Sequence, residues 1–417
     1  MSFLANLKLS FKYDILNLTI ALITASLLAR GLSLEDRGKV AVIIMLVSIV
    51  SILGAIVHSA NELEVGKHPD KSRLFVFKIC KDSFFYAVLG SFGSYIFLNY
   101  TNGYKYFLDL KYFGIYCLIL FLTVYSAGVQ RVLAANRKFL WVNRSVLVGS
   151  VTYLVGILIN KSLYGFSVEG VLLSNMLMLF VTMVLYVVSI YWLCPKPTEN
   201  TLLSFNIKNK YKINAKSTLQ DISLSVFLRV PLLQVSSVLG LESAGAFRIA
   251  STFQDLVLKI PRIINSVLKG FAVSQVGGWK RAICSANISL VVIIAASAVF
   301  YLIGEYVILL LFGEKYVHVK SLSTMLIAAL GPWSAFMILV GQLNVKRHYP
   351  LEITFIFLVY AMVFSVLCWY GLTWFGLNAI GKVFFGMSFL QYATLIVVIC
   401  KRTKLRYSHM FVLSVPR

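Results

Sequence analysis

Twelve apolar stretches run the length of the chain, and the segments between them alternate in basic charge. Odd-numbered segments, counted from the N-terminal one, hold 26 of the 39 Lys and Arg residues, and even-numbered segments hold 8. Basic residues in short loops stay on the cytoplasmic side of a membrane during insertion. The pattern therefore predicts a chain that crosses the membrane twelve times with both termini in the cytoplasm.

The apolar stretches are long enough to cross the hydrocarbon core as helices, which needs about 20 residues. Only helices and closed barrels satisfy their backbone hydrogen bonds in lipid, and these stretches lack the alternation of barrel strands. We therefore expect an all-α polytopic membrane protein. The predicted spans are 13–33, 39–59, 82–101, 112–134, 141–161, 170–194, 217–239, 245–272, 282–312, 320–344, 350–373 and 378–400.

The composition argues against several other classes of protein. Hydrophobic residues make up 59% of the chain and charged residues 13%, which is far from the usage of soluble domains. Most of the net charge of +23 comes from the basic residues of the segments predicted to be cytoplasmic, so no nucleic-acid partner is expected. The six cysteines show no CxxC spacing, so we expect no metal site, disulfide framework or cofactor.

Two sequence similarities predict an internal repeat. Residues 34–38 and 241–245 both read L-E-x-x-G, with an offset of 207, and the basic loops at 136–139 and 346–349 have an offset of 210. Convergence of short loops on Gly and basic residues is the alternative reading. The repeat predicts two six-helix bundles related by a pseudo-twofold axis along the membrane normal, with the substrate site between them. The bundles would cover 1–200 and 217–417, joined by a basic cytoplasmic linker at 201–216.

The eighth span carries charged residues at membrane depth. Arg248, Asp255, Lys259 and Arg262 are spaced by 7, 4 and 3 residues, which places them within a helical sector of about 60°. Each such charge costs at least about 2.5 kcal/mol at the bilayer centre. The stripe must therefore face a water-filled cavity or a charged partner.

Other ionisable residues extend this set on the first, seventh and twelfth spans. Arg30 and Lys382 lie near outer helix ends, where snorkelling to the interface is an equal alternative to a substrate role. Asp255 and Lys259 could pair at i, i+4, which would leave Arg248 and Arg262 unpaired within the helix. The candidate substrate-binding residues are Arg30, Arg229, Arg248, Lys259, Arg262 and Lys382, and the candidate ion-coupling residues are Asp14, Asp221 and Asp255.

A cavity lined by these residues would be net positive. Arginine binds phosphate and pyrophosphate groups through bidentate hydrogen bonds, whereas a cationic drug would be repelled. The charges therefore favour a large anionic substrate.

Three short segments resemble signatures of the Wzx-type polysaccharide flippases. Residues 27–38, LLARGLSLEDRG, resemble the first-helix signature of that family. Residues 238–250, VLGLESAGAFRIA, resemble its LG…vGxYxxA turn, and residues 311–316, LFGEKY, resemble its lfGxxY ending of the ninth span. The similarity covers nearly the whole chain, including the number of spans and the central basic loop.

The resemblance implies a twelve-helix bundle of two halves in the MOP superfamily, which includes the MATE multidrug exporters. It implies translocation of undecaprenyl-pyrophosphate-linked oligosaccharide repeat units across the bacterial inner membrane, for O-antigen or capsular polysaccharide synthesis. Alternating access through a cationic central cavity and coupling to a proton or sodium gradient are further implications. The expected partners are membrane lipid, the lipid-linked oligosaccharide and other polysaccharide assembly proteins.

One departure from the family concerns coupling. Many relatives carry an acidic residue after the Arg of the seventh helix, where this chain reads Arg229-Val230-Pro231. Asp14, Asp221 or Asp255 would then have to take over the role of that acid.

Two rival functions remain open at this level. A drug or metabolite exporter of the same superfamily is the first, although few deep acids are available to bind a cation. A membrane-embedded polysaccharide polymerase or ligase is the second, although such enzymes need a large outer loop and the longest one here is short. We therefore expect a transporter and not an enzyme.

The topology can be tested by labelling single cysteines from either side of the membrane. Residues 195–216 and 401–417 should react from the cytoplasmic side, and residues placed at Asn102 and Glu242 should react from outside, because the basic residues divide as 26 to 8. Labelling of Glu242→Cys only from the cytoplasm would contradict the span assignment.

Overall fold

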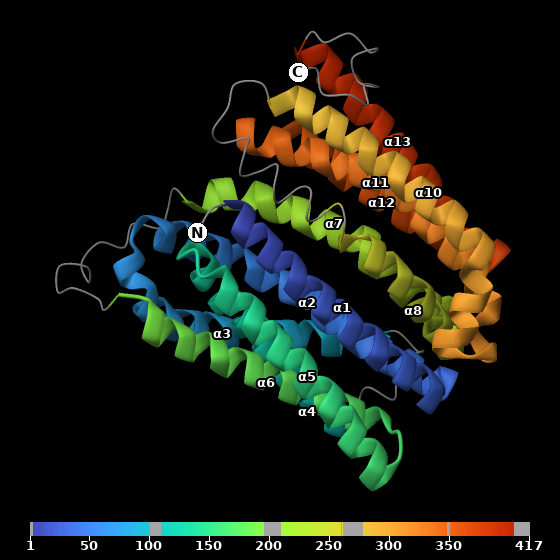
Figure 1. Cartoon of the computed structure of the whole chain (residues 1–417), viewed down its shortest axis with the longest axis horizontal. Coiled ribbons are helices and arrows are strands. Elements are labelled where there is room, and N and C mark those ends of the chain that lie inside the picture. The colour runs from blue at the N-terminus through green and yellow to red at the C-terminus, as the bar shows by residue number, and fades with distance from the viewer. Residues whose placement is uncertain are drawn as a thin grey trace. The chain divides into compact units, whose positions relative to one another are not determined.

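Helices make up nearly all of the residues that the computed structural model describes, which are 3–100, 110–195, 210–259, 261, 278–347 and 351–403. The chain divides into two compact units, Met1–Thr218 and Leu219–Arg417. Figure 1 shows the course of the chain through both.

In the N-terminal unit, the structure describes six long helices. They are α1 (Phe3–Gly31), α2 (Leu34–Lys67), α3 (Ser72–Tyr100), α4 (Leu110–Ala135), α5 (Phe139–Tyr164) and α6 (Val168–Leu193). A short 3-10 helix, η1 (Pro69–Lys71), connects α2 to α3.

The next helix, α7 (Lys210–Val238), begins just before the boundary between the units and continues into the second. The other elements of the C-terminal unit are α8 (Gly240–Val257), α10 (Gly278–Phe312), the 3-10 helix η4 (Glu314–Val319), α11 (Lys320–Arg347), α12 (Leu351–Phe375) and α13 (Asn378–Thr403).

Each of the twelve predicted spans corresponds to one helix, which confirms an all-α, multi-pass membrane protein. Helix α8 ends at Val257, and most of the remainder of the eighth predicted span lies outside the described residues. Most of the predicted linker at 201–216 lies outside the described residues. Among the described helices, eight are long and apolar enough to cross a membrane by length and composition: α1, α4, α5, α6, α10, α11, α12 and α13.

Helix α4 is central to the N-terminal unit, where it packs against α2, α3 and α6. Half of its apolar window is buried, compared with 17% for α1 and for α5. Its side chains Val129, Val132 and Leu133 are fully buried in one cluster with Phe75 of α3 and Tyr186 of α6. Close packing in this cluster holds α2, α3, α5 and α6 against α4.

Helices α5 and α6 approach each other closely because small residues line their contact. A Cβ atom at Gly149 would overlap the Oγ1 of Thr182, and one at Gly156 would lie 3.0 Å from the Oγ of Ser174. The Asn160 side chain donates hydrogen bonds to the Ser174 hydroxyl at 2.9 Å and to the Gly170 carbonyl at 3.1 Å. Small residues and interhelical hydrogen bonds are the usual basis of helix association in membranes.

Helix α11 has the same central role in the C-terminal unit. It packs against α10, α13 and α8. In the apolar span Glu314–Leu343, which joins η4 to α11, 78% of the most apolar window is buried. Phe336 of α11 packs edge-on against Phe357 of α12 at 5.0 Å between ring centroids. Ser289 of α10 and Ser334 of α11 form a buried hydrogen bond of 3.0 Å.

The outer surfaces of the peripheral helices are strongly apolar. Exposed side chains include Leu302, Tyr306 and Leu310 of α10, and large aromatic side chains lie near helix ends, such as Trp192 and Trp374. Such a surface suits hydrocarbon, and aromatic side chains near helix ends suit the membrane interface.

The close contact of α5 with α6 yields a stability prediction. Gly149→Val should destabilise the protein by about 1–3 kcal/mol, because the added atoms overlap the Thr182 hydroxyl in a packed interface. Gly114→Val is the matched control, since a Cβ there has no neighbour within 4 Å. Thermal unfolding in detergent measures both, and equal melting temperatures for the two variants would contradict the packing.

Candidate functional site

Helix α8 has one packed face and one charged face. Its packed face carries Ala246, Ile249, Ala250 and Phe253, which are buried where α8 meets α11 and η4. The Phe253 ring lies 4.7 Å from that of Phe300 and 5.5 Å from that of Phe312. These contacts hold the opposite face of α8 away from the core of its own unit.

The charged face of α8 is centred on an ion pair. The Nη1 atom of Arg248 lies 3.0 Å from Oδ2 of Asp255 and 3.2 Å from the Ser251 hydroxyl. Both charged side chains are partly exposed, Arg248 to 37% and Asp255 to 57%. The Thr252 hydroxyl donates to the Arg248 carbonyl at 2.8 Å and so stays on this face.

This geometry gives Arg248 a partner within α8. The sequence analysis expected Arg248 to stay unpaired within the helix, but it pairs with Asp255. Seven residues correspond to nearly two full turns, so Arg248 and Asp255 share one face, and the long arginine side chain spans the rise of about 10 Å between them. Lys259 is half-buried and makes contacts of its own.

The Arg248 guanidinium keeps unused hydrogen-bond donors. A guanidinium has five N–H donors in a planar fork. Only Nη1 is engaged among the described residues, by Asp255 and Ser251, which leaves Nε and Nη2 open. Two adjacent open donors on a charged group form the arrangement that binds phosphate or carboxylate in a bidentate manner.

The remaining predicted residues of the C-terminal unit are more dispersed. Arg229 is half-buried on α7, two residues before Pro231, and has contacts of its own. Lys382 is exposed in the second turn of α13. Arg262 and the side chain of Asp221 lie outside the described residues.

In the N-terminal unit, the predicted residues lie on α1. Asp14 is half-buried and Arg30 is exposed in the last turn. Between them, the Oδ1 of Asn17 is buried without a hydrogen-bond partner in the described part of the chain. Thr24 is buried, and its hydroxyl donates to the Ile20 carbonyl at 2.8 Å. Among the predicted residues, the structure brings Arg248 and Asp255 into direct contact.

A second group of polar residues, on α2, η1, α3 and α4, was not predicted. Lys71 is 2% exposed and lies 3.6 Å from Glu64, and Arg131 lies 3.8 Å from Glu62. Lys78 donates to Asn61 at 3.3 Å. The sequence signal was the cluster of polar residues at His58, Asn61, Glu62 and Glu64, since α2 continues to Lys67, eight residues beyond the predicted span.

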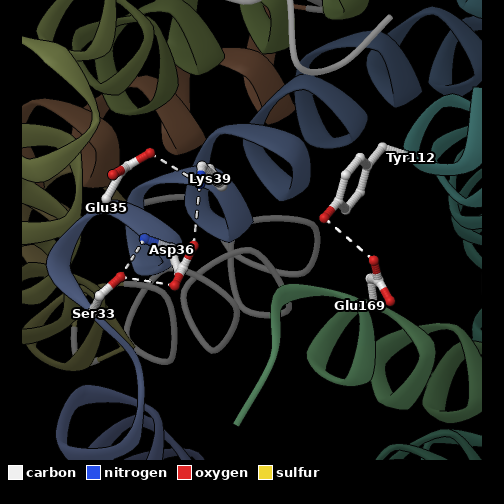
Figure 2. A network of polar contacts seen from close by, with 6 residues as sticks. All are labelled: Ser33, Glu35, Asp36, Lys39, Tyr112 and Glu169. Carbon is white, nitrogen blue, oxygen red and sulfur yellow. Dashed lines mark hydrogen bonds and ion pairs between the residues drawn. The ribbon is translucent and has the colours of Figure 1, made fainter. Parts of the chain in front are cut away.

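The two repeated loop motifs have structural roles. In the first, Ser33 caps α2: its Oγ accepts from the Asp36 amide at 3.0 Å, and Lys39 pairs with Glu35 at 2.9 Å (Figure 2). Figure 2 also shows Tyr112 of α4 donating to Glu169 in the first turn of α6 at 3.4 Å. Acidic residues at the start of a helix are favoured by its dipole, which explains the L-E-x-x-G motif at the start of both α2 and α8.

The second motif turns the chain between α4 and α5. Arg137 adopts a positive φ of 58°, and the Asn136 amide donates to the Ser72 hydroxyl at 2.9 Å. Arg73 donates in turn to the Cys194 carbonyl at the end of α6, at 2.9 and 3.2 Å. These hydrogen bonds connect the start of α3 to the ends of α4 and α6.

No family model matches the chain, and no curated protein matches it. Solved structures are similar to it over nearly its whole length. A mutant of the Vibrio cholerae MATE transporter VcmN is 13% identical over 98% of this chain and 99% of that one, with a TM-score of 0.67. The lipid II flippase MurJ in an inward closed conformation is 14% identical over 96% of this chain and 89% of that one, with a TM-score of 0.60.

A third similar structure is a MOP superfamily transporter from Pyrococcus furiosus with a binding pocket of reverse polarity. It is 14% identical over 97% of this chain and 93% of that one, with a TM-score of 0.54. At these identities the similarity concerns the fold. The chain therefore has the multi-pass helical fold that MATE transporters share with the lipid II flippase MurJ.

Proposed function

We propose that this protein is a flippase that moves a lipid-linked anionic oligosaccharide across the bacterial inner membrane. The observation that carries the proposal is the charged face of α8, which its own unit leaves uncovered while it buries the apolar face. A guanidinium at membrane depth needs water or an anion, and a pyrophosphate-linked sugar supplies two phosphate groups.

The substrate class rests on three further points. The fold is that of MurJ, which is a lipid II flippase, and of MATE transporters. The resemblance to Wzx-type flippases points to undecaprenyl-pyrophosphate-linked repeat units for O-antigen or capsular polysaccharide. Arg248 has two N–H groups, Nε and Nη2, that are open to a phosphate, and Arg229 lies on α7, the helix that precedes α8 in the chain.

The proposal includes an orientation and a role for the ion pair. Both termini would lie in the cytoplasm, as the basic residues indicate. Asp255 would hold Arg248 while the site is empty and release it when a phosphate competes for the same guanidinium. Arg30, Lys259, Arg262 and Lys382 remain candidate contacts, and Asp14, Asp221 and Asp255 remain candidate coupling residues.

A drug or metabolite exporter is the second candidate function, favoured by the similarity to MATE transporters. The two candidates differ in the charge of the cargo. Deletion of the gene should change drug susceptibility if the protein is an exporter, and surface polysaccharide if it is a flippase. A polymerase or ligase is less well supported, because all three similar structures described above are those of transporters or a flippase.

The test of the proposed function is Arg248→Ala in cells that lack their own copy of the gene. Surface polysaccharide should be lost although the protein is produced normally, because an exposed ion pair contributes only about 0–1 kcal/mol to stability. Arg248→Lys should restore export only in part, since an ammonium group cannot make the bidentate bond. Lys401→Ala, at an exposed basic residue near the end of α13, is the control.

A second variant tests the role of Asp255 separately from that of Arg248. Asp255→Asn keeps the shape of the side chain but removes its charge, so it should fold and leave Arg248 free to hold phosphate more tightly. Full polysaccharide export by an Arg229→Ala, Arg248→Ala double variant would contradict the proposed function.

A further inference from the structure

A groove between α3 and α4 has no part in the proposed function so far. Its volume is about 580 Å³, within the range of about 300–1,000 Å³ that is usual for pockets that hold small molecules. Both helices belong to the N-terminal unit and pack against each other. Six residues of α3 and four residues of α4 line the groove, and none of these described side chains is charged.

Small side chains form the floor of the groove and large ones form its walls. Ala87 and Ser91 of α3 line it and are only 5% and 7% exposed. Phe92 of α3 and Leu118 of α4 line it as well, and they are 64% and 53% exposed. The Oγ of Ser91 is buried without a hydrogen-bond partner in the described part of the chain. The groove is therefore a recess with an apolar lining.

Aromatic pairs lie at both ends of this recess. Phe84 of α3 meets Phe121 of α4 edge-on, with ring centroids 6.4 Å apart, and Tyr95 of α3 meets Phe113 of α4 edge-on at 5.6 Å. Tyr95 follows Phe84 by eleven residues, and Phe121 follows Phe113 by eight. At a rise of about 1.5 Å per residue, these pairs bound a slot of about 12–16 Å along the helix axes.

The slot has the length of one leaflet of a membrane. The hydrocarbon core is about 30 Å thick, so each leaflet supplies about half of that. Residues Tyr112–Ala135 of α4 form a candidate membrane span, and the groove lies along the first half of it. The topology predicted from the basic residues puts the end of α3 and the start of α4 on the outer side. On that topology, the slot lies at the depth of the lipid chains of the outer leaflet.

We propose that this groove binds a stretch of the polyprenyl chain of the lipid-linked cargo in the outer leaflet. A hydrocarbon chain along the membrane normal matches the slot in direction, length and polarity. The apolar lining does not suit the phosphate and sugar groups, because burial of a polar group without hydrogen bonds is unfavourable. This inference rests on the proposed function, for which it supplies the place that holds the lipid end of the cargo after the head group has crossed.

The width of the groove favours a polyprenyl chain over the straight chain of a phospholipid. A volume of about 580 Å³ along the length of the slot corresponds to a mean cross-section of about 40 Å². A polyprenyl chain carries a methyl branch on every isoprene unit and fills such a width. A straight acyl chain would leave part of it empty, and the lining atoms would lose contacts there.

The test is photolabelling of the protein in lipid nanodiscs. The probe is a polyprenyl diphosphate with a diazirine in its chain, and mass spectrometry locates the labelled residues. We expect labels on residues 84–95 of α3 and 113–121 of α4. A tenfold excess of unlabelled polyprenyl diphosphate should reduce them by about tenfold, as mass action requires for one shared site. A phospholipid with a diazirine in its acyl chain, at the same concentration, should label these segments more weakly.

Variants show whether the groove itself is labelled. Cys117→Trp places a large ring in the groove and should reduce labelling by about tenfold, which corresponds to one order of magnitude in affinity. Leu89→Trp is the matched control, since Leu89 is 50% exposed on α3 but does not line the groove, and it should leave the labelling unchanged. Phe92→Ala removes an exposed wall and should also weaken the labelling, so the test stands even if Cys117→Trp fails to fold.

The other possible occupants are outcomes of the same experiment. Labelling by the phospholipid probe that equals that of the polyprenyl probe would assign the groove to bulk lipid and overturn the proposal. Labelling that ignores both Cys117→Trp and Phe92→Ala would overturn it as well, and so would a second copy of the chain crosslinked across the groove in place of the probe.

Export separates this inference from the proposed function. Cys117→Trp should reduce surface polysaccharide and Leu89→Trp should not. Normal export by Cys117→Trp, together with loss of export in Arg248→Ala, would overturn the role of the groove and leave the proposed function standing. Full export by the Arg229→Ala, Arg248→Ala double variant would contradict the proposed function, and the photolabelling would still decide whether the groove binds a polyprenyl chain.

Discussion

The cost of placing a charge in hydrocarbon determines what α8 can do. Its apolar face is buried against α11 and η4, so its charged face cannot also be covered by these elements. Arg248 and Asp255 reduce the cost for each other, but both remain partly exposed and the guanidinium keeps open donors. A helix held in this way needs water or an anion beside it.

The two units place their polar groups differently. In the N-terminal unit, charged and polar residues lie among α2, η1, α3 and α4, where Lys71 and His58 are almost fully buried. In the C-terminal unit, the pair on α8 stays exposed, while the buried polar contacts are neutral, as between Ser289 and Ser334.

The sequence predicted the fold better than the site. Long apolar stretches located the twelve long helices that the structure describes, because hydrocarbon thickness imposes their length. The pairing of Arg248 was missed, since a contact across seven residues depends on side-chain reach and not on simple i, i+4 spacing. The polar group on α2, η1, α3 and α4 was missed because α2 continues past the apolar stretch to Lys67, and because its members come together only in the folded chain.

Water access to the charged face of α8 tests the central claim most directly. In a protein without its native cysteines, Thr252→Cys on the charged face is compared with Ala250→Cys on the packed face and Leu302→Cys on the exposed apolar surface of α10. A membrane-impermeant thiol reagent should label only Thr252→Cys, because Ala250 is buried and Leu302 faces lipid. Labelling of Thr252→Cys as slow as that of Leu302→Cys would show that the charged face meets hydrocarbon, and would contradict the account.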